Sequence, residues 1–71
     1  MTIDPTFQVR GKVVLDKPYD GTAMGDWLSR HLGAYGRNWL TLMRPDQPPV
    51  LCFADFTNAV AFALAFDLVP R

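Results

Sequence analysis

The sequence predicts a small α+β fold with the element order β-α-β-β-α. Residues 7–16 alternate between apolar and polar side chains, which is typical of a half-buried strand. Residues 22–32 carry apolar side chains three and four positions apart, which indicates an amphipathic helix. Two short apolar segments then flank the turn sequence "PDQPP", which predicts a hairpin. The 71 residues allow one domain, 1–71, with residues 1–6 as a short N-terminal tail.

The first strand has one apolar and one polar side. Its apolar side is predicted to carry Phe7, Val9, Val13 and Leu15, and its polar side Gln8, Arg10, Lys12 and Asp16. Gly11 interrupts this pattern, so we expect a bulge there or the close approach of another segment. The sequence "KPYDG" ends the strand.

The helix predicted over residues 22–32 has recognisable ends. Its apolar stripe consists of Met24, Trp27, Leu28 and Leu32. Asp20 or Thr22 can cap the N-terminus, because their side-chain oxygens accept from free backbone N–H groups. Gly33 follows the last helical residue, where a left-handed conformation commonly ends a helix.

The hairpin is predicted from "NWLTLMR" and "VLCFA". In the first of these strands Leu40 and Leu42 are expected to face the core, and Trp39, Thr41 and Met43 the other side. Pro48 and Pro49 cannot donate a backbone hydrogen bond, so they are expected to mark the beginning of the next strand.

The stretch "NAVAFALAF" allows two interpretations. Its large residues alternate with alanines, as in a strand, but alanine is the best helix former and is depleted in strands. We therefore predict a helix over residues 56–67, capped by Asp55 or Thr57. The alternative is a strand that continues after residue 60 and turns Phe62, Leu64 and Phe66 into the core.

As a helix, this segment has large apolar side chains on two faces. Phe56, Val60 and Leu64 form one ridge, and Phe62 and Phe66 lie nearly opposite. The first ridge is expected to dock on the sheet, which leaves Phe62 and Phe66 for a contact between two subunits of a homodimer.

These elements predict a three-stranded antiparallel sheet with both helices on one face, related to a truncated ferredoxin-like fold. The open sheet face is expected to carry Arg10, Lys12, Trp39 and Met43. Basic and aromatic side chains on an open sheet can bind nucleic acid by stacking on bases. The formal net charge of zero argues against this, so nucleic-acid binding is the alternative function.

Residues suited to catalysis or metal binding are few. His31 is the only histidine and Cys52 the only cysteine. Asp26, Ser29 and His31 lie on one helix at a spacing that does not bring a nucleophile and a base together. We therefore predict a non-enzymatic protein with no cofactor and no metal. The longest apolar run, residues 59–66, is too short to cross a membrane, so we expect a cytoplasmic protein with a reduced Cys52.

The C-terminal run "VLCFADFTNAVAFALAF" resembles a pattern in small uncharacterised bacteriophage proteins, in which an apolar strand leads into a "DAVxFxLxF" helix. The matching residues are Phe53, Asn58, Ala59, Val60, Phe62, Leu64 and Phe66, and "GDWLSRHLG" resembles the upstream helix. This chain departs from the pattern at Asn58, where an acid is common, and at Ala63 and Ala65, where charged or polar residues are common. The resemblance implies a phage or bacterial accessory protein that binds a host protein and modulates or inhibits it.

Overall fold

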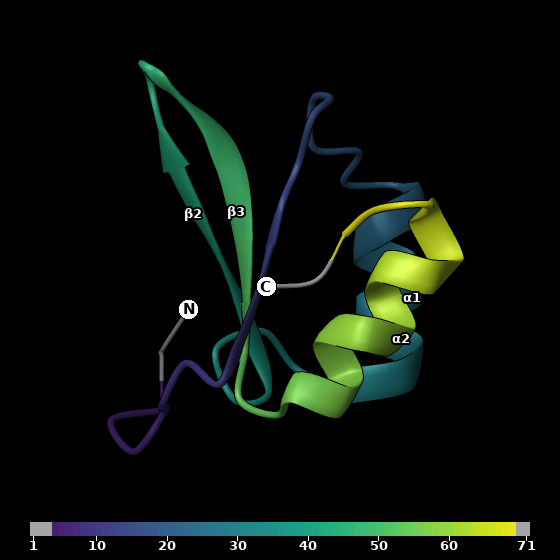
Figure 1. Ribbon diagram of the computed structural model, residues 1–71. Coiled ribbons are helices and arrows are strands. Elements are labelled where there is room, and N and C mark those ends of the chain that lie inside the picture. The colour runs from purple at the N-terminus through teal and green to yellow at the C-terminus, as the bar shows by residue number, and fades with distance from the viewer. Residues whose placement is uncertain (1–3, 70–71) are drawn as a thin grey trace.

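A three-stranded antiparallel sheet and two helices form two layers in the computed structural model, which describes residues 4–69 (Figure 1). The elements are β1 (Gly11–Val14), α1 (Ala23–Leu32), β2 (Trp39–Arg44), β3 (Gln47–Phe53) and α2 (Phe56–Phe66). The strand order is β1-β3-β2, and both helices lie on the same side of the sheet. The predicted α+β fold and element order are therefore confirmed, although β1 is shorter than the predicted strand.

The helix ends are those that local chemistry predicts. The carboxylate of Asp20 accepts hydrogen bonds from the N–H groups of Thr22 and Ala23, each at 3.0 Å. The carboxylate of Asp55 accepts from the Thr57 N–H at 2.8 Å. Gly33 has a φ of 85° and donates its N–H to the Ser29 carbonyl. Each contact satisfies a backbone group that the helix leaves free at its end.

The core lies between the sheet and the two helices. The sheet contributes Val13, Leu15, Trp39, Leu51 and Phe53, α1 contributes Met24 and Leu28, and α2 contributes Ala59, Phe62 and Ala63. Phe62 is at the centre of an aromatic group, with its ring 5.6 Å from those of both Phe53 and Trp27. Trp27 also packs edge-on against Phe66 at 6.3 Å, which joins α1 to α2.

Gly11 allows α2 to approach β1 very closely. A Cβ atom at this position would lie 2.7 Å from the Ala59 Cβ and 3.1 Å from the Phe56 Cα. The close approach predicted at Gly11 is thus confirmed. A small residue on each element lets the helix rest on bare strand backbone.

The predicted orientation of α2 is wrong. Phe62 is completely buried and Phe66 half-buried, whereas Phe56 is 48% and Leu64 78% exposed. The physical reason is that Ala59 lies beside Phe62 and Phe66 on the helix surface, so this side can approach the sheet while the rings fill the space toward α1. The strand interpretation of this segment is also excluded, because residues 56–66 are helical.

The predicted facing of β2 is wrong by one residue. Trp39 pairs with Phe53 across the sheet and is only 5% exposed, so it faces the helices. Its indole N–H donates to the Gly33 carbonyl at 3.0 Å, and the Tyr35 ring packs edge-on against it at 4.9 Å. These contacts hold the largest side chain of the strand in the core. Since side chains alternate along a strand, Leu40 and Leu42 turn to the opposite face.

The first strand is only partly as predicted. Val13 and Leu15 face the core, but β1 begins at Gly11, so Phe7 and Val9 lie outside the strand. Phe7 is half-buried and Val9 is 46% exposed.

The two prolines lie inside β3 at an irregularity in the sheet. Between the partner pairs Leu42–Val50 and Arg44–Gln47, the single residue Met43 stands opposite Pro48 and Pro49. A bulge accommodates residues that cannot donate to the ladder, which explains how a central strand tolerates them. The strand begins one residue before the prolines, at Gln47.

Candidate functional site

The sheet face opposite the helices carries two rows of paired side chains. One row consists of Lys12, Cys52 and Leu40, and the other of Val14, Val50 and Leu42. Within residues 4–69, both helices lie on the other side of the sheet (Figure 1). The side chains of these two rows are therefore available to pack against something other than α1 and α2.

The row of Lys12, Cys52 and Leu40 lies nearer the N-terminal segment of the chain, and two of its three side chains are covered. Leu40 is 8% exposed and Cys52 is fully buried. Residues 4–10 run along this end of the sheet: the Asp4 N–H donates to the Gly36 carbonyl at 2.8 Å, and the Arg10 N–H to the Phe53 carbonyl at 2.9 Å. Figure 1 shows this segment on the side of the sheet away from the helices. The open part of the face is therefore the half nearer the hairpin turn.

This open half forms a pocket of about 420 Å³, here called the open-face pocket. Its apolar lining is Val14, Leu42, Pro48 and Val50, and its polar lining is Lys12, Arg44 and Gln47. Leu42 is 44% exposed, while Val14 and Val50 are half-buried. An apolar floor with polar groups at its margin is typical of a surface that binds a partner.

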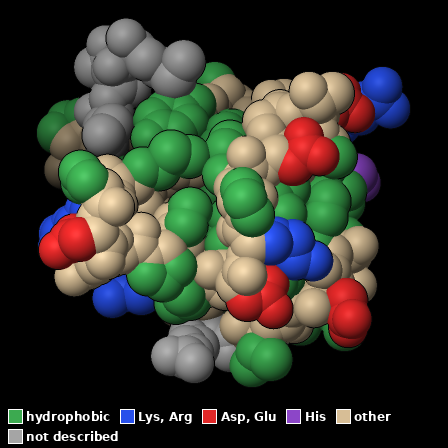
Figure 2. Space-filling view, turned by 90° about the horizontal axis from the view of Figure 1, so that it is seen from above, with side chains coloured by type: hydrophobic (Ala, Val, Ile, Leu, Met, Phe, Trp, Pro, Cys, Tyr) green, Lys and Arg blue, Asp and Glu red, His purple; other side chains and the backbone are tan. Residues whose placement is uncertain are grey.

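The charges around the open-face pocket have one sign. Lys12 and Arg44 are both exposed, and none of the lining residues is acidic. In the part of the chain that the structure describes, the only ion pair joins Arg30 to Asp26 at 3.1 Å on α1, so it does not involve these two cations. Figure 2 shows hydrophobic side chains reaching the surface among scattered charges, and in this view most acidic side chains lie over the helices.

Cys52 belongs to the covered row of this face and does not line the open-face pocket. Burial raises the pKa of the Cys52 thiol, and the positive charge of Lys12, its neighbour across the sheet, opposes this shift. Because the thiolate is the reactive form of cysteine, a buried thiol with a raised pKa is a poor nucleophile. Cys52 therefore acts as a small apolar packing residue.

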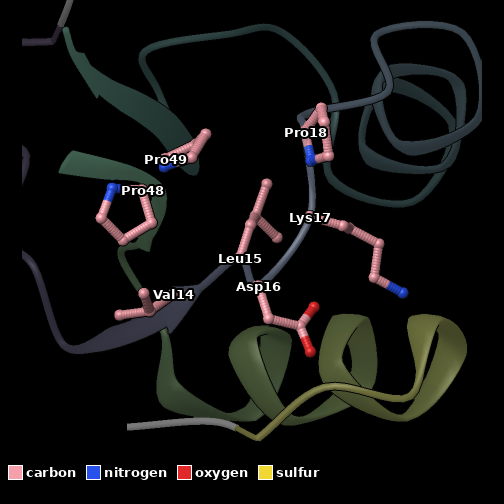
Figure 3. Close-up of a pocket in the computed structure, with 7 residues that line it drawn as sticks. All are labelled: Val14, Leu15, Asp16, Lys17, Pro18, Pro48 and Pro49. Carbon is pink, nitrogen blue, oxygen red and sulfur yellow. The ribbon is translucent and has the colours of Figure 1, made fainter. Parts of the chain in front are cut away.

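A second pocket of about 570 Å³ adjoins the first and shares Val14 and Pro48 with it. Figure 3 shows Leu15 directly after the C-terminal end of β1, with the two prolines of β3 on one side of it. The side chains of Asp16 and Lys17 point away from the prolines in this view. This pocket extends the apolar surface of the sheet but brings no charged group to its centre.

His31 is not brought together with Asp26 and Ser29 in one site. His31 contacts the Trp27 carbonyl through Nδ1 at 2.9 Å, and its ring stacks on Trp27 at 4.3 Å. A carbonyl oxygen only accepts, so Nδ1 carries the proton in this contact. Ser29 and Asp26 line a different pocket, of about 660 Å³, beside β2. Among residues 4–69, no group of three His, Cys, Asp or Glu side chains is placed to hold a metal ion.

The outer edge of β2 is closed by a side chain. The Tyr35 hydroxyl donates to the Thr41 carbonyl and accepts from the Thr41 N–H, both at 3.2 Å. Gly36 also donates its N–H to the Trp39 carbonyl at 2.7 Å. These contacts use backbone groups of Trp39 and Thr41 that another strand would need in order to pair with the first half of β2.

The predicted site residues lie in different places. Of the predicted open-face residues, Lys12 lines the open-face pocket, whereas Arg10 is exposed before β1, where its Nη2 donates to the Gln8 Oε1 at 3.2 Å. Trp39 belongs to the core, so its predicted place on the open face is wrong. Met43 is 56% exposed near the hairpin turn and is not a lining residue of the open-face pocket.

The predicted subunit contact through Phe62 and Phe66 loses its basis. Phe62 has no exposed surface, and Phe66 packs against the core. Of the residues that line the open-face pocket, the sequence interpretation placed only Lys12 on this face. It took Leu42 for part of the core and assigned no face to Val14, Arg44, Gln47 and Val50. The signal that could have found Val50 is the unbroken run "VLCF", because a strand that is apolar on both faces has a second face to cover.

Comparison with protein-family models, curated proteins and solved structures gave no match for this chain. Within residues 4–69 the helices are too short to cross a membrane.

Proposed function

We propose that this chain is a non-enzymatic protein-interaction module that binds its partner through the open-face pocket. The observation that carries the proposal is Leu42, which is 44% exposed in the lining of a concave apolar surface while the other sheet face is covered by the helices. Large apolar side chains gathered in a concave patch with a polar margin are typical of protein-binding surfaces.

The apolar ridge of α2 is the competing surface, but it is less suited to binding. Leu64 is 78% exposed, and it lines none of the pockets described above. Phe56 already covers Gly11: its Cδ1 atom lies 3.3 Å from the position that a Gly11 Cβ would take. Scattered exposed apolar residues of this kind are common on soluble proteins.

The pocket favours the nucleic-acid alternative only through its two cations, Lys12 and Arg44. That interpretation depended on Trp39 as a stacking platform, and the ring is 5% exposed in the core. The lining of the open-face pocket includes no aromatic side chain. The resemblance to bacteriophage accessory proteins predicts further that the partner is a host protein and that binding modulates or inhibits it.

Affinity capture with matched variants tests the proposal. The wild-type chain, Leu42→Asp and Leu64→Asp are each used as bait in a bacterial lysate, and bound proteins are identified by mass spectrometry. Leu64→Asp introduces the same charge at a more exposed apolar position, so it controls for general stickiness. We expect a partner that the wild type and Leu64→Asp retain and Leu42→Asp loses. A partner lost only with Leu64→Asp would contradict the proposed site. Circular dichroism confirms that each bait is folded.

A further inference from the structure

We propose that the occupant of the open-face pocket is an acidic amphipathic helix of another protein. This inference rests on the function proposed above and adds the chemistry of the partner. Three features of the pocket carry it: the single sign of its charges, the state of its backbone groups, and the apolar character of its floor.

The charges select an acidic partner. Lys12 and Arg44 stand at the margin of the pocket, both exposed, with no acidic lining residue to neutralise them. The nearest acids along the chain lie elsewhere: Asp46 is in the hairpin turn outside the lining, and Asp16 points toward α2 (Figure 3). Since the whole chain is neutral, this local excess of positive charge is a property of the face itself. Carboxylates on the partner complement it and exclude basic partners.

The same charges argue against a second copy on this face. A two-fold contact between two open faces would bring Lys12 and Arg44 of one subunit toward those of the other. The face provides no acid to separate them, so like charges would meet in a partly desolvated interface. The partner is therefore a different protein.

The backbone of the face selects a helix over an extended segment. β3 is the central strand and is paired on both sides, so it has no free edge to which a strand could be added. On the outer edge of β2, Tyr35 and Gly36 use the backbone groups of Thr41 and the Trp39 carbonyl. The floor of the open-face pocket consists of side chains from paired strands, so a segment bound there makes its contacts with those side chains. A helix presents a stripe of apolar residues three and four apart with charges at its flanks, and covers a sheet face as α1 and α2 cover the opposite one.

A peptide selection tests this inference without a known partner. A displayed library of random peptides of about 16 residues, about 24 Å long as a helix, is selected on the wild-type chain. Each selected peptide is then measured against three variants. Leu42→Asp removes an exposed large apolar side chain from the lining, and Lys12→Glu/Arg44→Glu reverses the charge of the margin. Lys17→Glu/Arg37→Glu makes the same charge change at exposed positions outside the pocket.

We expect selected peptides with a negative net charge and apolar residues three and four apart. Leu42→Asp and Lys12→Glu/Arg44→Glu should each weaken their binding about tenfold or more, and Lys17→Glu/Arg37→Glu less than about threefold. Circular dichroism should show helix formation on binding. Neutral or basic peptides, or peptides that bind in an extended form, would overturn the inference. So would binding that Lys12→Glu/Arg44→Glu leaves unchanged.

The outcomes separate this inference from the proposed function. If Leu42→Asp abolishes binding but the charge reversal has no effect, the open-face pocket is the binding site and the acidic helix is wrong. If Leu42→Asp has no effect on any selected peptide, both fail. Parallel titrations with transfer RNA and with vesicles containing phosphatidylserine address other anions. The inference would also be overturned if transfer RNA or the vesicles bound as tightly as the best peptide and this binding required Lys12 and Arg44.

Discussion

Replacement of Gly11 by alanine is a direct test of how α2 packs on β1. The added Cβ would lie 2.7 Å from the Ala59 Cβ and 3.1 Å from the Phe56 Cα, so helix and strand must separate. Overpacking of this kind costs about 1–3 kcal/mol. Alanine also restricts the unfolded chain more than glycine does, which offsets about 0.4–1 kcal/mol of this cost. We therefore expect a net destabilisation of about 1–2 kcal/mol, a large part of the roughly 4–11 kcal/mol that a chain of this length has in total.

Urea denaturation followed by circular dichroism measures this effect, and two further variants sharpen it. Gly21→Ala is the matched control, because its Cβ would meet no heavy atom closer than the Tyr19 Cε2 at 3.7 Å. Ala59→Gly removes the opposing atom and by itself costs about 1 kcal/mol as a glycine within a helix. In the double variant the shortest contact is gone and only the approach to Phe56 remains, so the two costs should not add fully and a coupling of about 1 kcal/mol should appear. A Gly11→Ala protein as stable as the wild type, or strictly additive costs, would refute the packing argument.

The remaining predictions concern stability, pH and self-association. Phe62→Leu should lower the free energy of unfolding by about 1–3 kcal/mol and Leu64→Ala by less than about 0.5 kcal/mol; denaturation giving the reverse order would show that α2 docks through its other face. The pKa of Cys52 is raised by folding from its ordinary value of 9.0, so the folded chain keeps a proton that the unfolded chain releases. The stability that this difference contributes is complete below about pH 9 and is lost as the pH rises further. The free energy of unfolding of Cys52→Val should therefore fall less steeply with alkaline pH than that of the wild type. Equal slopes for the two proteins would contradict this. Tyr35→Phe frees the Thr41 backbone at the β2 edge, so sedimentation should show more self-association at high concentration than the wild type shows; an unchanged monomer fraction would count against the role of the hydroxyl.

Local chemistry was sufficient to predict the element order and the helix ends. Asp55 and Gly33 act on backbone groups within a few residues of themselves, so the sequence alone indicates what they do. The close approach at Gly11 was also predictable as one of two alternatives, because a glycine within a strand commonly marks either a bulge or a place where another backbone comes near. These features need no knowledge of what lies across the core.

The facing of β2 and α2 could not be predicted in the same way. Both elements carry large apolar side chains on two sides, so alternation and the helical wheel give no preference between them. Tertiary contacts decide: Trp39 is held inside by the Gly33 carbonyl and the Tyr35 ring, and Phe62 by Phe53 and Trp27. The facing of β2 decides which of its side chains lie on the open face. Lys12 on β1 could therefore be predicted there, whereas Leu42 on β2 could not.

Methyl NMR of the labelled chain, with and without the partner captured from lysate, tests the central claim most directly. Val14, Leu42 and Val50 report on the open-face pocket, and Leu64 is an exposed reporter outside it. We expect the methyl resonances of Val14, Leu42 and Val50 to shift on binding, and those of Leu64 to remain unchanged. Shifts centred on Leu64, with Leu42 unaffected, would place the partner on α2 and contradict the proposed site.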